Sequence, residues 1–80
     1  MKIPAIKKLV ESYTEAQLND AAEALENEST PNIEVPGDDE GEQLTHALAA
    51  AWILERMRDG KVEFKVALRE YTGMVRGSIS

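Results

Sequence analysis

Cysteine is absent from this sequence of 80 residues, and histidine and tryptophan occur once each. Without cysteine the chain has no disulfide, no thiolate nucleophile and no Cys-based zinc or iron–sulfur site. The absence also fits a reducing compartment, so we expect the protein in the cytoplasm. A chain of this length forms one small domain with a modest core, and we expect a single helical domain over residues 1–80.

Long apolar runs are also missing. The longest run, Ala47–Leu54, has eight residues, whereas a helix that spans a membrane needs about 20. The N-terminal residues are basic but include no continuous apolar stretch and no small-residue cleavage site, which argues against a signal peptide. We therefore expect no membrane partner.

Lysine and arginine are absent between Lys8 and Arg56, and that interval holds twelve acidic residues. The chain thus divides into segments with charges of +3, −12 and +3, and its net charge is −6. A protein that binds duplex nucleic acid normally shows a dominant basic surface, so nucleic acid is not an expected partner. Either oppositely charged helices are neighbours in the fold, or copies of the chain associate through complementary patches.

Apolar spacing predicts two helices in the first third of the chain. Residues 4–13 carry apolar side chains at helical intervals, and Pro4 fits the first helical position. Thr14 and Gln17 have the spacing of a capping box, which predicts that a second helix begins after a sharp corner at Tyr13–Thr14. The alternative is a single bent helix.

Prolines interrupt the helical pattern at positions 31 and 36. Between them, Ile33 and Val35 alternate with a polar residue, which is typical of extended chain. No second strand is evident to pair with this stretch. We expect a short extended segment near residues 32–35 that packs two apolar side chains onto the core.

A third helix is predicted from Asp38 or Asp39 to Arg58, with Gly60 as the left-handed residue that ends it. Between Leu44 and Leu54 this helix is apolar on nearly every side, which is typical of a central helix. Its alanines would let neighbouring helices approach closely.

A fourth helix is predicted over residues 62–76, with a frayed tail from about residue 77. The fold class is therefore all-α, a compact domain of four helices around a central apolar helix. The predicted core consists of Ile6, Leu9, Leu18, Leu25, Leu44, Leu48, Ala51, Phe64, Leu68 and Tyr71.

Acidic residues crowd the start of the third helix, where backbone N–H groups lack partners and the helix dipole favours negative charge. This explains them without a ligand. The alternative is a metal site, because Asp39, Glu42 and His46 fall on one helical face and could bind Zn²⁺, Mn²⁺ or Fe²⁺. Their spacing matches neither a calcium loop, nor a ferritin-like site, nor a zincin. We expect no metal and no cofactor.

His46 is more typical of a residue at the edge of a core than of a general base, and Glu42, one turn earlier, is its natural hydrogen-bond partner. No hydroxyl lies in a nucleophile elbow. No dinucleotide-binding or Walker loop occurs either. We therefore expect no catalytic residue and no enzymatic activity.

Trp52 is a candidate interaction residue, because tryptophan is enriched at the energetic centres of interfaces. On a helical wheel it lies away from the edge formed by Leu44, Leu48 and Ala51. The side chain is either part of the core or an apolar group left over after one side of the helix is packed.

Lys61, Lys65 and Arg69 recur at helical intervals and form a basic edge. The edge is a solvated face, a neighbour of the acidic second helix, or a contact for an acidic partner. Nucleic-acid binding by these residues together with Arg76 is a further alternative.

Three stretches of the sequence, "IPAIKKLVESY", "IEVPGDDEGEQLTHALAAAWILERM" and "FKVALREYTGMVR", resemble a family of small uncharacterised bacterial proteins, a domain of unknown function. The resemblance implies a complete protein of about this length and brings no activity or site residue. The leading hypothesis is a small acidic non-catalytic protein–protein interaction module, with an unknown partner or as a homodimer. The alternative is a metal-dependent protein that uses Asp39, Glu42 and His46.

Overall fold

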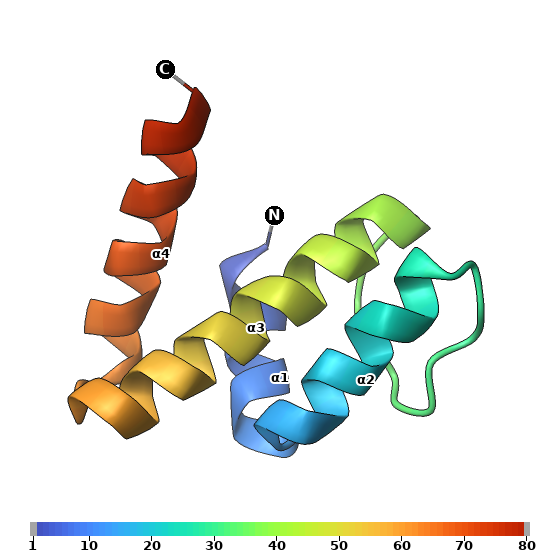
Figure 1. Ribbon diagram of the computed structural model, residues 1–80, viewed down its shortest axis with the longest axis horizontal. Coiled ribbons are helices and arrows are strands. Elements are labelled where there is room, and N and C mark those ends of the chain that lie inside the picture. Colours follow the sequence, from blue (N-terminus) through green and yellow to red (C-terminus); the bar gives the residue numbers. More distant parts are fainter. Residues whose placement is uncertain (1, 80) are drawn as a thin grey trace.

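Helices account for all the regular structure in the computed structural model, which describes the backbone of residues 2–79 and the side chains of residues 2–77 (Figure 1). No strand occurs within that range. The prediction of an all-α fold with four helices is confirmed. The helices are α1 Ile3–Ser12, α2 Glu15–Glu26, α3 Glu40–Gly60 and α4 Phe64–Ile79.

The corner between α1 and α2 is fixed by reciprocal hydrogen bonds. The Thr14 hydroxyl oxygen accepts from the backbone N–H of Gln17 at 3.2 Å, and the Gln17 side-chain oxygen accepts from the backbone N–H of Thr14 at 2.9 Å. Two N–H groups that the helix start would leave without partners are thereby satisfied. The predicted capping box is confirmed.

The third helix is central, as predicted. It contacts each of the other three helices, and α2 runs antiparallel alongside it while α1 lies behind it (Figure 1). Ala47, Ala49 and Ala50 have no exposed surface on α3, and Ala21 and Ala22 are buried on α2. Small side chains on both helices let the backbones approach closely.

The core is thin. The molecule measures 31 × 29 × 19 Å, and its shortest dimension corresponds to about two helix diameters of roughly 10 Å each. Ile6, Leu9, Leu18 and Ile53 are the largest apolar side chains that are fully enclosed. Helices in so thin a body keep one side in contact with solvent.

The predicted core is largely confirmed, with one error. Six of the predicted residues are buried, and Leu44, Phe64 and Leu68 are partly buried against them. Leu48 is instead 42% exposed, because no neighbouring helix covers its side of α3. Ile53, which was not among the predicted core residues, is fully enclosed.

The connector between α2 and α3 folds back onto α3. Val35 is buried and Ile33 packs against the core, as predicted, although the chain bends at residues 32–33. The Gln43 amide donates to the Val35 carbonyl at 3.1 Å. Gly37 has a φ of 154°, and a Cβ there would lie 2.8 Å from the Gln43 backbone nitrogen. Only glycine fits this approach.

The end of α3 differs from the prediction. The helix includes Gly60, and Lys61 is the left-handed residue, with a φ of 52°. A Cβ at Gly60 would overlap the guanidinium of Arg56 unless that flexible side chain moved. That guanidinium donates to both carboxylate oxygens of Glu70 on α4.

The fourth helix begins at Phe64 and continues to Ile79, past the predicted end at residue 76. The predicted frayed tail from residue 77 falls partly on residue 80 and on side chains outside the described residues. In Figure 1 the C-terminal half of α4 stands away from the other helices.

We predict that Gly37→Ala lowers the free energy of unfolding by about 1–3 kcal/mol, because alanine is strained at this φ and overlaps Gln43. Urea denaturation followed by circular dichroism measures the change. Gly73→Ala is the matched control, since a Cβ at Gly73 meets nothing within 4 Å. In a helix that substitution raises stability by about 0.5–1 kcal/mol. Equal stability of Gly37→Ala and the parent protein would contradict the assigned role.

Candidate functional site

His46 is the one buried polar or charged side chain among the described residues, with no exposed surface. Its Nε2 accepts a hydrogen bond from the backbone N–H of Lys2 at 2.9 Å. Its Nδ1 lies 2.7 Å from the carbonyl oxygen of Pro36. The ring therefore joins the start of α1, the end of the connector and the first half of α3.

These contacts fix the tautomer of the ring. A carbonyl oxygen only accepts, so Nδ1 carries the hydrogen and donates to Pro36. A backbone N–H only donates, so Nε2 carries none and accepts from Lys2. The imidazole is neutral and both of its nitrogens are occupied. The prediction that Glu42 is the hydrogen-bond partner of His46 is wrong. The backbone groups of Lys2 and Pro36 occupy both ring nitrogens instead.

The acidic residues before α3 hold the helix start together. The Asp39 carboxylate accepts from the backbone N–H of Glu42 at 2.8 Å, as an N-cap does. The Glu42 carboxylate accepts from the backbone N–H of Asp38 at 2.9 Å. These contacts agree with the structural interpretation of the acidic stretch.

Lys2 completes the same cluster from α1. Its ammonium lies 3.3 Å from Asp38 and 3.6 Å from Glu42. The hydrogen bond with Asp38, followed by the negative charges of Asp38 and Glu42, raises the pKa of the Lys2 ammonium. Lys2 is exposed to solvent, so its ion pairs contribute little to the free energy of unfolding.

The metal candidates Asp39, Glu42 and His46 do not converge on a common point. The described residues contain no group of three His, Cys, Asp or Glu side chains placed to hold a metal ion. His46 has no free nitrogen, and the two carboxylates bond to backbone N–H groups. Nothing in this geometry favours the metal hypothesis.

Trp52 belongs to a solvent-facing apolar surface, which we call the Trp52 face; it consists of Leu44, Leu48 and Trp52 on α3 and Met74 on α4. The buried ring of Tyr71 on α4 contacts Trp52 from the core. Trp52 is half-buried, and its ring stacks at a tilt on that of Tyr71, with centroids 5.6 Å apart. Met74 is 48% exposed. It follows Tyr71 by three residues and so lies one turn further along the same side of α4.

The structure thus gives Trp52 both of its predicted environments, core on one side and solvent on the other. A shallow cavity of about 260 Å³ adjoins it, lined also by Glu55, Arg56 and Asp59. Sequence reasoning placed Leu48 on a separate, buried edge. It lies instead one turn from Trp52 on the exposed side.

The basic edge Lys61, Lys65 and Arg69 is exposed, and none of the three forms an ion pair with a described residue. On α2, Glu15 pairs instead with Arg58 of α3 at 2.7 Å. Lys65 borders a cavity between α4 and the start of α1. Sequence reasoning missed this cavity because its two walls are far apart in the chain.

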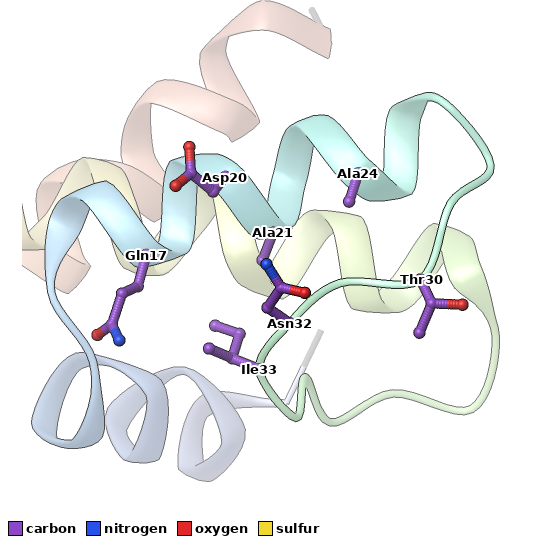
Figure 2. Close-up of a pocket in the computed structure, with 7 residues that line it drawn as sticks. All are labelled: Gln17, Asp20, Ala21, Ala24, Thr30, Asn32 and Ile33. Atoms are coloured by element: carbon purple, nitrogen blue, oxygen red, sulfur yellow. The ribbon is translucent and has the colours of Figure 1, made fainter.

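A second cavity, of about 250 Å³, lies between α2 and the connector (Figure 2). Figure 2 shows Asn32 directed from the connector toward Ala21, with Gln17 and Asp20 further along α2. The cavity is smaller than most ligand sites, which are about 300–1,000 Å³. Gln17 is already engaged in the capping box.

We predict that NMR of the imidazole nitrogens shows His46 as a single neutral tautomer with its hydrogen on Nδ1 at neutral pH. Stoichiometric Zn²⁺ should leave these signals unchanged, because both nitrogens are bonded and enclosed. Long-range proton–nitrogen correlation spectra measure both properties. A hydrogen on Nε2, or specific Zn²⁺-induced shifts at His46 and Glu42, would contradict the assignment and favour the metal hypothesis.

We also predict that stability falls at alkaline pH. Burial raises the pKa of the Tyr71 hydroxyl above its ordinary value of 10.0. The protonated Tyr71 hydroxyl therefore contributes its full share of stability below pH 10. That share is lost as pH rises through the raised pKa of the folded state. The pKa of Lys2 is also raised, so its deprotonation likewise lowers stability at alkaline pH.

Urea unfolding across a pH series measures this dependence. Tyr71→Phe is the control, since it keeps the ring against Trp52 and removes the ionisable group. Its stability should fall less steeply above pH 10 than that of the parent protein, leaving the share due to Lys2. Identical alkaline profiles would show that Tyr71 does not contribute.

None of the helices among the described residues is long and apolar enough to cross a membrane. No curated protein and no solved structure matches the chain. One family model does match it, over residues 1–80, and this confirms the resemblance noted in the sequence. Because the match extends over the whole sequence, the chain belongs to a family of unknown function, DUF6952.

Proposed function

We propose that this protein is a small non-catalytic protein–protein interaction module of the cytoplasm, and that it forms a homodimer through the Trp52 face. One observation carries the proposal: an apolar side chain near the middle of the central helix α3 faces solvent. Leu48 is 42% exposed at the centre of α3, beside the half-exposed ring of Trp52. Exposed apolar surfaces of this kind mark sites of association.

The shape of the Trp52 face suits a two-fold dimer. Leu44, Leu48 and Trp52 recur about every turn, so they form a straight stripe along α3. Two copies of such a stripe pack antiparallel, with Leu48 near the symmetry axis. In antiparallel packing the two helix dipoles point in opposite directions, which is the favourable arrangement.

The residues around the stripe also support an interface. Tryptophan and methionine are enriched in interface centres, and the Trp52 face holds Trp52 and Met74. Charged groups lie at its edge, where Glu55 and Asp59 line the cavity beside Trp52. An apolar centre with a charged rim is the usual arrangement of interfaces.

We predict a dimer mass by light scattering at micromolar concentration. Leu48→Glu should weaken dimerisation by at least about tenfold, because it buries an unpaired charge at the centre of the interface. Val66→Glu is the matched control, since Val66 is 43% exposed and lies on another side of α4. It should keep the parent's dimer mass.

Circular dichroism of both variants checks that the helices are intact, which we expect because both positions are exposed. A monomer mass for the parent protein at all concentrations would overturn the homodimer. A dimer that survives Leu48→Glu unchanged would place the interface elsewhere.

A further inference from the structure

A groove with apolar walls and a basic rim lies between the first turn of α1 and the first turns of α4. Its volume is about 490 Å³. We call it the basic groove; its lining residues are Ile3, Lys7, Glu63, Phe64, Lys65 and Leu68. Ile3 is 49% exposed, and Phe64 and Leu68 are only partly buried. Three large apolar side chains therefore face solvent together.

The positive charge of this groove is not neutralised within the described residues. Lys7 on α1 and Lys65 on α4 form no ion pair there, whereas Lys2, Arg56 and Arg58 each do. The one acidic residue in the lining is Glu63. On a chain with a net charge of −6, the basic groove is a local region of opposite sign.

The spacing of the apolar side chains in the groove matches that of a helical ligand. Phe64 and Leu68 are four residues apart, so their side chains lie one helical turn from each other. A second amphipathic helix with two large apolar side chains one turn apart can place both between Ile3 and this pair. Carboxylates beside those apolar residues would then reach Lys7 and Lys65.

The chemistry argues against two other occupants, nucleic acid and the acidic helix α2 of a second copy. Nucleic acid would bring phosphates to the lysines but would leave the apolar walls unmatched, and Glu63 would repel it. A second copy of this chain offers acidic side chains on α2, but Leu18 and Leu25 of that helix are buried. The acidic helix of another copy therefore has no large apolar side chains to offer.

We propose that the basic groove binds an acidic amphipathic helix of a partner protein. The binding side of α4, with Phe64 and Leu68, differs from the side that carries Met74 in the Trp52 face. No residue belongs to both the basic groove and the Trp52 face, so this proposal holds for a monomer as well as for a dimer.

The test uses the full chain and a fluorescently labelled helical peptide with two leucines four residues apart, flanked by glutamates. Anisotropy should show saturable binding that weakens as salt concentration rises. Amide shifts in the NMR spectrum should centre on Ile3, Lys7, Phe64 and Leu68. A peptide of the same composition with its leucines on opposite faces should bind about tenfold more weakly or worse.

Charge-reversal variants locate the contact. Lys65→Glu should weaken binding by about tenfold or more, because it reverses a charge at the rim of the groove. Lys8→Glu is the matched control, since Lys8 is exposed on α1 and does not line the groove. It makes the same change in net charge and should bind nearly as the parent does.

Several outcomes would overturn the proposal. One is that the acidic peptide does not bind saturably at all, and another is that polyglutamate or the rearranged peptide binds as tightly as it does. A third is that Lys8→Glu and Lys65→Glu weaken peptide binding equally. The last is that a DNA duplex binds more tightly than the peptide at the same salt concentration. Leu48→Glu separates the two proposals: it should bind the peptide as the parent does, even if the parent is itself a monomer.

Discussion

The pair of hydrogen bonds made by His46 is the constraint on which the arrangement of this small body depends. One enclosed imidazole accepts from Lys2 at the start of α1 and donates to Pro36 at the end of the connector. The start of α1 and the end of the connector are thereby both held to one point on α3. An apolar residue of similar volume would leave both backbone groups without partners, at a cost of about 1–3 kcal/mol for each. We therefore assign to the single histidine a structural role.

The position of Lys2 also shapes the surface that follows it. Because His46 holds the Lys2 backbone, α1 starts at a defined place, and Ile3 and Lys7 on that helix reach the first turns of α4. Directly after Pro36, Gly37 lies against Gln43 so closely that a side chain would not fit. The connector therefore closes over α3 on the side opposite to the Trp52 face, where the imidazole also lies.

Local chemistry made most of the fold predictable. Thr14 and Gln17 form the capping box that their spacing implies, and Asp39 caps α3 with its own carboxylate. Apart from the ends of α3 and α4, the errors concern long-range packing. Which side of an apolar helix faces solvent depends on where α2 and α4 lie, so the exposure of Leu48 could not be read from its neighbours in sequence. The backbone partners of His46 and the groove between α1 and α4 were missed for the same reason.

The thinness of the molecule connects its stability to its proposed interactions. A body only 19 Å across cannot enclose every side of its central helix, and the alanines that let α2 approach closely leave the bulkier Leu48 and Trp52 on the other side. Larger side chains in place of Ala47 or Ala50 would push α2 away and cost core packing. The same choice of small residues thus stabilises the monomer and concentrates apolar area on one exposed face. Association through that face would bury apolar surface that the thin body cannot enclose by itself.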